Sequence, residues 1–259
     1  MTPEEIIDRY KKGETSEQIA AAAGVSYKTI LRTLKSYQIP IRPKGGRRIH
    51  KANTSFFKTW TNKMAYALGI IYADASINPD QYRISIIQSD EEALRMLAKT
   101  LECDPNIGRA GEDNRYPVLL INSKEMVLDL LSLGITPSGA LKSRAPNVPE
   151  EFFSHFARGV FDGDAYFKTG ADVVVMRPGS RVLSKRLMDK LEELGAVAEL
   201  DTKEDVYRIT ITGIDSLRVF YDWLYKDARG VYISTKREQF TKRFDYDFWK
   251  KQQPKKYGL

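Results

Sequence analysis

The 259-residue sequence predicts an α+β fold, in which a small all-α domain precedes two pseudo-symmetric αββαββα repeats. An apolar stretch with a central glycine and a terminal aspartate occurs twice, at 67–75 and at 157–165. Helical and strand-like patterns follow both copies in the same order. Residues 1–39 instead read as short capped helices. The repeated order is stronger support for a duplicated fold than either stretch alone.

The first segment, residues 1–39, is predicted to contain three helices. Their ranges are 3–12, 16–23 and 26–37. Thr15 and Ser26 are placed to cap the second and third helices, and Gly24 can take the positive φ needed between them. One face gathers the apolar residues Ile19, Ala20, Val25, Ile30 and Leu34. These residues predict a small core of their own.

The string 15–30 resembles the helix-turn-helix of resolvase-type and small repressor domains, with 26–37 as the recognition helix. The resemblance implies that five outward side chains face a DNA major groove. They are Ser26, Tyr27, Lys28, Thr29 and Arg32. A small helical domain that binds another protein is the alternative interpretation.

Residues 40–58 are predicted to form a basic linker or arm. Between Pro40 and Lys51 there are two prolines, two glycines, five basic residues and no acidic residue. The pattern is similar to arms that other DNA-binding proteins lay in a minor groove. The contacts would come from Arg42, Lys44, Arg47 and Arg48. A solvated hinge is the alternative.

The first repeat is predicted at 59–146 and the second at 147–249, followed by a basic tail at 250–259. In the first repeat we expect helices at 63–74, 90–102 and 123–133, and strands at 82–88, around 107 and at 117–121. In the second we expect helices at 150–162, 180–194, 214–225 and 234–249, and strands at 171–176, 197–200 and 206–212. Aromatic residues at helical spacing are predicted to be core: Tyr66, Phe152, Phe153, Phe156, Phe161, Phe220 and Trp223.

The two aspartates that end the repeated stretches are the main candidates for chemistry. Gly69 and Gly159 lie five residues before Asp74 and Asp164, where a missing side chain lets two helices approach closely. The two carboxylates would then emerge side by side. Paired carboxylates suit a divalent metal ion, which prefers hard oxygen ligands. A helix-packing interface without chemistry is the alternative.

The two stretches resemble the LAGLIDADG nonapeptide of homing endonucleases. Each stretch aligns with the nonapeptide without a gap, and the last acidic residue of the nonapeptide then corresponds to Asp74 in the first stretch and to Asp164 in the second. The resemblance covers roughly residues 60–245. It implies two repeats whose strands form a saddle over DNA, and a single-chain, metal-dependent DNA endonuclease. Ala75 and Ala165 depart from the terminal glycine of the motif. Tyr72 departs from its first aspartate, which Asp162 retains.

The resemblance also implies a set of site residues. Mg²⁺ would bind Asp74 and Asp164, with the backbone carbonyls of Ala73 and Gly163 nearby, and Mn²⁺ or Ca²⁺ can occupy the same sites. A basic residue in each half would support the transition state. Lys236 is the candidate in the second half, and Lys142, ahead of Arg144, is the candidate in the first. Gln88, at the end of a strand, is a further polar candidate.

Base contacts would come from the strands, which present alternating side chains to the major groove. The candidates in the first repeat are Arg83, Ser85, Arg109 and Arg115. Those in the second are Lys168, Arg177, Arg181, Lys203 and Arg208. A strand arginine is also common on a solvated face, so we expect about half of these to touch DNA.

The formal charge of +7 fits a polyanionic partner, and the excess lies at the two ends of the chain. Residues 1–51 carry +6 and residues 235–259 carry +5, whereas 52–234 carry −4. A single cysteine and two histidines exclude a disulfide framework and a structural zinc cluster. We expect a soluble, intracellular protein that binds double-stranded DNA, with no membrane partner. Two internal repeats in one chain predict a monomer.

Two other functions remain open for this fold. A regulator could keep the fold and the helix-turn-helix without cutting, although neither acidic motif residue is lost. An intron RNA maturase is equally compatible with the basic ends. Cleavage requires the metal, whereas DNA or RNA binding does not, so added metal discriminates among them. An intein is disfavoured because the chain lacks a starting Cys or Ser and a terminal His-Asn pair.

Overall fold

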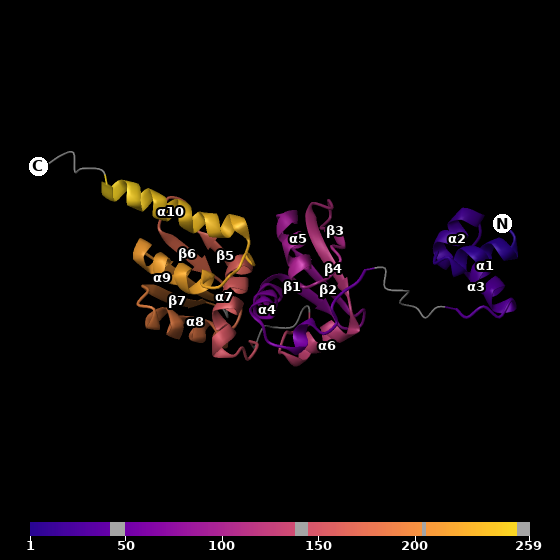
Figure 1. Cartoon of the computed structure of the whole chain (residues 1–259), viewed down its shortest axis with the longest axis horizontal. Coiled ribbons are helices and arrows are strands. Elements are labelled where there is room, and N and C mark those ends of the chain that lie inside the picture. Colours follow the sequence, from indigo (N-terminus) through magenta and orange to yellow (C-terminus); the bar gives the residue numbers. More distant parts are fainter. Residues whose placement is uncertain (42–49, 138–144, 204–205, 253–259) are drawn as a thin grey trace, which may run out of the picture. The chain divides into compact units, whose positions relative to one another are not determined.

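The computed structural model describes residues 1–41, 50–137, 145–203 and 206–252, and the side chains of these residues up to 246 (Figure 1). The chain divides into two compact units, 1–51 and 52–259. Six basic residues discussed above lie outside the described residues: Arg42, Lys44, Arg47, Arg48, Lys142 and Arg144.

The first unit consists of α1 (Pro3–Lys11), α2 (Ser16–Ala23) and α3 (Tyr27–Ser36). Thr15 and Ser26 cap α2 and α3, and Gly24 ends α2 with a φ of 66°. The core of this unit contains Ile6, Tyr10, Ile19, Ala20, Ile30 and Leu34. The expectation that Val25 belongs to this core is wrong, because Val25 is 44% exposed. It follows the left-handed Gly24 in the turn and is therefore outside the helical periodicity.

The second unit contains the predicted repeats, and the α+β class with its duplicated order is confirmed. The first repeat contains α4 (Asn62–Asp74), β1 (Ala75–Asn78), β2 (Arg83–Ile87), α5 (Glu91–Thr100), β3 (Ile107–Ala110), β4 (Tyr116–Asn122) and α6 (Lys124–Ser132). The second contains α7 (Glu150–Asp164), β5 (Ala165–Phe167), β6 (Val173–Met176), α8 (Arg181–Glu193), β7 (Ala198–Lys203), β8 (Val206–Thr212) and α9 (Ile214–Tyr225). A further helix, α10 (Ser234–Gln252), follows.

Each repeat forms a four-stranded antiparallel sheet with the same strand order, β1-β2-β4-β3 in the first and β5-β6-β8-β7 in the second. Two strands were not located from the sequence. They are β1 and β5, each of which begins at the alanine directly after the terminal aspartate of α4 or α7. They are only four and three residues long, too short for alternation to be recognised.

The two repeats meet through α4 and α7, which lie side by side (Figure 1). A Cβ added to Gly69 would collide with the carbonyl oxygen of Phe156, and one added to Gly159 would collide with that of Tyr66. The two glycines therefore allow the backbones of the two helices to touch. Both helices are buried along most of their length, within one core cluster that includes residues of both repeats.

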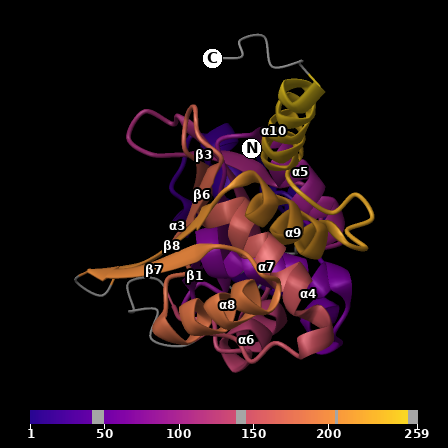
Figure 2. The same cartoon turned by 90° about the vertical axis from the view of Figure 1, so that its left-hand side faces the viewer.

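Helices cover one face of each sheet, with α5 and α6 on the first and α8 and α9 on the second. Successive side chains on a strand point to opposite faces of its sheet. The side chains that point away from the helices therefore form an open face on each sheet. The β7 and β8 strands form a hairpin that projects beyond the rest of its sheet (Figure 2).

The predicted linker of 40–58 extends too far. The structure places residues 52–58 in the second unit, where Ala52 pairs with Cys103 in an isolated bridge. A short 3-10 helix, Phe56–Lys58, follows, and Phe56 and Phe57 are both buried. Two adjacent phenylalanines are the sequence signal that this stretch packs onto the repeat.

Candidate functional site

The ends of α4 and α7 bring the two repeated aspartates together. Asp74 and Asp164 are the last residues of their helices, and both are half-buried. A Cβ added to Gly163 would lie 2.7 Å from Asp74 Oδ2 and 2.6 Å from Ala73 Cβ. The carboxylate of Asp74 therefore lies against the backbone of the residue that precedes Asp164. This is the arrangement expected from the repeated sequence stretches.

Two of the predicted polar residues lie at this pair of helix ends. Gln88, directly after β2, donates from Nε2 to Asp74 Oδ2. Lys236, in the first turn of α10, donates from Nζ to the backbone oxygen of Ala165. Burial lowers the pKa of Lys236, while the charges of Asp162, Asp74 and Asp164 oppose that shift. Lys236 is thus within electrostatic range of both motif aspartates.

A buried hydrogen-bond network, whose partners are not evident from the sequence, supports the position of Lys236. Asp162 is 1% exposed, and its Oδ2 accepts from the hydroxyl of Tyr66 at 2.7 Å and from the backbone N–H of Ile233 at 2.8 Å. Ile233 directly precedes α10. Burial raises the pKa of Asp162 to about 6 against these hydrogen bonds, which favour the charged form. Asp162 thereby ties the start of α10 to α7.

A second buried group on α7 ties down the segment between α9 and α10. Arg158 is fully buried and donates from Nε to the carbonyl oxygen of Val231 at 3.0 Å and from Nη1 to that of Leu224 at 2.7 Å. Nη1 also lies 2.9 Å from His155 Nδ1. Burial and the charge of Arg158 lower the pKa of His155 to about 4, so the neutral ring accepts this hydrogen bond.

The signal for this network was present in the sequence. His155, Arg158 and Asp162 are spaced by three and four residues, which places them on one face of an otherwise apolar helix. Polar groups buried at helical spacing need hydrogen-bond partners. Apart from the contact between His155 and Arg158, their partners lie far along the chain, and these cannot be identified before the fold is known.

The residues at the helix ends fit a divalent cation. Asp74 and Asp164 offer hard carboxylate oxygens from two elements at one place, and the backbone carbonyls of Ala73 and Gly163 belong to the same two helix ends. Among the described residues no group of three or more His, Cys, Asp or Glu side chains is arranged so that it could hold a metal ion. Two protein carboxylates suit Mg²⁺, which keeps several waters and shares substrate phosphates.

The predicted DNA-contacting residues of the first sheet do not all lie on its open face. Arg83 and Ser85 lie on the open face of β2, where Arg83 donates to Asn122 Oδ1 at 3.3 Å. Arg109 pairs with Pro117 and so shares the face of Leu119, which helices cover. Arg109 also forms an ion pair with Glu91 of α5 at 3.3 Å. The expectation that Arg109 points to the open face is therefore wrong, because its side chain points to the face that the helices cover.

Arg115 lies in the turn before β4, where it forms an exposed ion pair with Asp113 at 3.1 Å. The predicted contact residues of the second repeat are all exposed: Lys168, Arg177, Arg181, Lys203 and Arg208. Lys203 and Arg208 lie in β7 and β8, and Lys168 and Arg177 directly follow β5 and β6. The expectation that Arg181 lies in a strand is wrong, because it is the first residue of α8. Arg177 lies over the ring of Tyr166 at 5.9 Å from the centroid. Asp201 lies directly across from Arg208, so the open face of this sheet carries acids as well as bases.

In the first unit, all five predicted contact residues at the start of α3 are exposed. Ser26 also has a structural role, because its Oγ accepts from the backbone N–H of Thr29 at 3.2 Å and lies 3.0 Å from Thr29 Oγ1. Tyr27, Lys28 and Arg32 are then the side chains least committed to the helix itself. Within the described residues, no helix is long and apolar enough to cross a membrane.

Comparison with known proteins gives distant similarities. No protein-family profile matches the chain. The chain is 25% identical over 174 residues to the replication factor C small subunit of Methanocaldococcus jannaschii, which covers 63% of this chain and 9% of that protein. The chain thus matches less than a tenth of the length of this curated relative.

Several solved structures are similar to the chain at low sequence identity. Full-length DUF199/WhiA from Thermatoga maritima is 14% identical with a TM-score of 0.48, covering 75% of this chain and 64% of that one. The homing endonuclease I-WcaI bound to its DNA recognition sequence is 11% identical with a TM-score of 0.48, covering 80% and 97%. I-DmoI in complex with DNA and Mn is 16% identical with a TM-score of 0.43, covering 66% and 98%.

Proposed function

We propose that the chain is a site-specific, double-strand DNA endonuclease of the LAGLIDADG homing type. The observation that carries this proposal is the convergence of Asp74 and Asp164 at the ends of two helices packed backbone to backbone. Two carboxylates placed side by side at the ends of packed helices repel each other, because adjacent like charges disfavour the charged form. Helix packing alone therefore does not explain them. A bound cation removes that cost.

The cation in this proposal is Mg²⁺, with Mn²⁺ or Ca²⁺ able to take its place, held by Asp74 and Asp164 beside the carbonyls of Ala73 and Gly163. A divalent metal supplies Lewis-acid stabilisation of the attacking and leaving oxygens in phosphodiester hydrolysis. The pseudo-two-fold relation of α4 and α7 presents one carboxylate to each DNA strand. This relation accounts for a chain with two acidic helix ends.

The neighbouring side chains have complementary roles in this proposal. Lys236 brings a positive charge next to both aspartates, where it supports negative charge that develops on phosphate. Gln88 orients the carboxylate of Asp74 through its hydrogen bond. Lys142, the proposed counterpart of Lys236, belongs to the first half of the same site.

DNA would lie across the open faces of the two sheets, contacted by Arg83, Arg177 and Arg208 among others. The exposed start of α3 and the basic residues 42–48 would extend the recognised site beyond the sheets. The proposed domain limits are 1–39 for the helix-turn-helix, 59–146 and 147–249 for the repeats, with residues 52–58 packed onto the first repeat, and 250–259 for a basic tail. The protein would act as an intracellular monomer, which gel filtration tests.

The test is cleavage of a randomised double-stranded DNA library with and without Mg²⁺, comparing the natural chain with Asp164→Asn. Asp189→Asn is the matched control, since Asp189 is an exposed acid on α8 paired with Lys185. We expect metal-dependent cuts at one long sequence, lost in Asp164→Asn and kept in Asp189→Asn. Selective DNA or RNA binding without cleavage in Mg²⁺ or Mn²⁺ would contradict the nuclease and favour a regulator or a maturase.

A further inference from the structure

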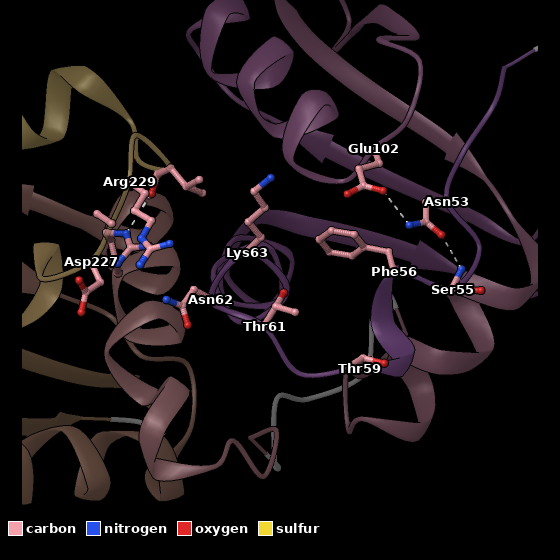
Figure 3. A pocket seen from close by; sticks show the side chains of 13 residues that line it. Asn53, Ser55, Phe56, Thr59, Thr61, Asn62, Lys63, Glu102, Asp227 and Arg229 are labelled. Carbon is pink, nitrogen blue, oxygen red and sulfur yellow. Dashed lines mark hydrogen bonds between the residues drawn. The ribbon is translucent and has the colours of Figure 1, made fainter.

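A cavity of about 560 Å³ opens at the first turn of α4, at the opposite end of that helix from Asp74. At 1.5 Å per residue the two helix ends are roughly 18 Å apart, so the cavity is separate from the paired carboxylates. In Figure 3, Thr61, Asn62 and Lys63 surround the helix start, with Phe56 on one side and Asp227 and Arg229 on the other. Nothing in the proposed nuclease chemistry uses this cavity.

The helix start itself favours an anion. The first N–H groups of an α-helix have no partner within the helix and carry partial positive charge. Thr61 Oγ1 accepts from the backbone N–H of Met64 at 3.1 Å, which satisfies one of them. Asn62 and Lys63, whose N–H groups also have no acceptor within the helix, both line the cavity.

A buried guanidinium gives independent support. Arg158 lines the cavity and is fully buried, and its Nε and Nη1 are already bound to backbone oxygens of Val231 and Leu224. Its Nη2 is buried with no hydrogen-bond partner among the described residues. An unpaired N–H on a buried cation is costly, and an oxyanion is the partner that a guanidinium binds best.

The rest of the lining sets the chemical class of the ligand. Lys63 and Arg229 add two exposed positive charges at the rim. Glu102 also lines the cavity, but Asn53 donates to its carboxylate at 2.8 Å. Phe56, Ala228 and Val231 supply an apolar wall, and the volume is larger than a bare phosphate needs. Hydroxyls, cations and an apolar wall together suit a phosphate group that carries a small organic part.

We propose that this cavity binds a small phosphate-bearing molecule, with its phosphate at the start of α4 near Arg158, Lys63 and Arg229. Asp227 is the group that weakens this binding, because its carboxylate shares the cavity with the phosphate. It has a φ of 58°, a conformation that asparagine adopts readily, so Asp227→Asn removes the charge without backbone strain. Removing positive charge from the cavity should therefore weaken phosphate binding, whereas removing the negative charge of Asp227 should strengthen it.

The test is thermal unfolding of the full chain titrated with adenosine 5′-monophosphate, inorganic phosphate, adenosine or sodium chloride at equal ionic strength. We expect Tm to rise with the logarithm of ligand concentration above Kd, by about 5 °C at a hundredfold excess over Kd, with one or both phosphate compounds, and no rise with adenosine or chloride. Comparing the two phosphate compounds separates a free phosphate site from a phosphate ester site. A rise with adenosine equal to that with the nucleotide, or no rise in Tm beyond that with sodium chloride, would overturn the proposal.

Variants place the binding in this cavity rather than on the proposed DNA surface. Lys63→Ala combined with Arg229→Ala should weaken binding at least tenfold, while Lys185→Ala, an exposed lysine on α8, should leave it unchanged. Asp227→Asn should tighten binding at least threefold. Equal binding in the double variant, or weaker binding in Asp227→Asn, would contradict the assignment. Because none of these readouts involves DNA cleavage, failure here is distinct from failure of the nuclease proposal.

Discussion

The two central helices, α4 and α7, have matching sequence patterns but bury different kinds of side chain. Counted back from the terminal aspartates, α7 has His155, Arg158 and Asp162 where α4 has Ala65, Leu68 and Tyr72. All six residues are buried. In α4 this face is packed mainly by apolar contacts, whereas in α7 it holds polar groups that bind backbone atoms between Leu224 and Ile233.

This difference shows how two repeats with the same order of elements become asymmetric through their buried side chains. The polar residues of α7 hold the segment that leads into α10, and α10 carries Lys236 to the paired carboxylates. The corresponding positions of α4 offer no charged group for such an anchor. The two halves therefore support their aspartates in different ways, and substitutions at matching positions should have unequal effects.

The largest effect is expected when α7 is given the residue that α4 has. Arg158→Leu would leave the carbonyl oxygens of Leu224 and Val231 without their donors inside the core. Two buried acceptors without partners should cost about 4 kcal/mol of the free energy of unfolding. Urea denaturation measures this loss. In α4, Leu68→Met is the control and should cost less than about 1.5 kcal/mol, and equal losses at the two positions would contradict the asymmetry.

The contact between α4 and α7 should tolerate no side chain at the central glycine of either helix. Gly159→Ala places a Cβ against the carbonyl oxygen of Tyr66, which is backbone and cannot rotate away. We expect a loss of about 3 kcal/mol in the free energy of unfolding, and a similar loss for Gly69→Ala. Gly108→Ala is the control, because its Cβ would meet only side chains at 3.7 Å. A loss at Gly159 no greater than at Gly108 would mean that the helices are not in backbone contact.

Acid should destabilise the fold through His155, which has no counterpart in α4. The pKa of His155 is lowered to about 4 in the folded chain, below its ordinary value of 6.5, so the unfolded chain binds more protons between these values. The contribution of His155 to stability should therefore fall by about 2 kcal/mol between pH 7 and pH 5, whereas Asp162, whose pKa is raised to about 6, makes a smaller change of opposite sign. Urea titrations at both pH values measure this, and His155→Gln should remove about that much of the dependence. An unchanged dependence in the variant would assign it to other groups.

The smallest loss of stability should come from removing the hydrogen bond between Tyr66 of α4 and Asp162 of α7. Tyr66→Phe removes the hydroxyl that donates to Asp162 at 2.7 Å while keeping the ring in the core. A hydrogen bond to a buried carboxylate predicts a loss of about 1.5 kcal/mol. Tyr116→Phe is the control, since Tyr116 is 46% exposed. If both substitutions cost the same, the Tyr66 hydroxyl contributes little to stability.

Much of this architecture was predictable because it depends on local patterns. The terminal aspartates, the central glycines and the repeated order of elements all lie within short stretches of sequence, and they predicted the fold class and the meeting of Asp74 with Asp164. The ends of elements were less well predicted. α7 continues to Asp164 rather than ending at Asp162, because the chain changes from helix to strand only at Ala165.

Features that depend on pairing between distant segments were not predictable. The direction of Arg109 depends on the register of β3 against β4, and a shift of one residue moves a side chain to the other face. Likewise, the backbone partners of Asp162 and Arg158 lie about 70 residues further along the chain. Spacing along one helix indicated that these residues were unusual, but it did not identify what they bind.

Asp74 and Asp164 are proposed to form together one metal-dependent DNA-cleaving site. The most direct measurement is cleavage, in Mg²⁺, of the long DNA sequence selected from the randomised library, with the two strands labelled separately. The natural chain should cut both strands, whereas Asp74→Asn combined with Asp164→Asn should bind the same DNA and cut neither. Mg²⁺-dependent cutting of both strands by that double variant, at the rate of the natural chain, would contradict the assignment.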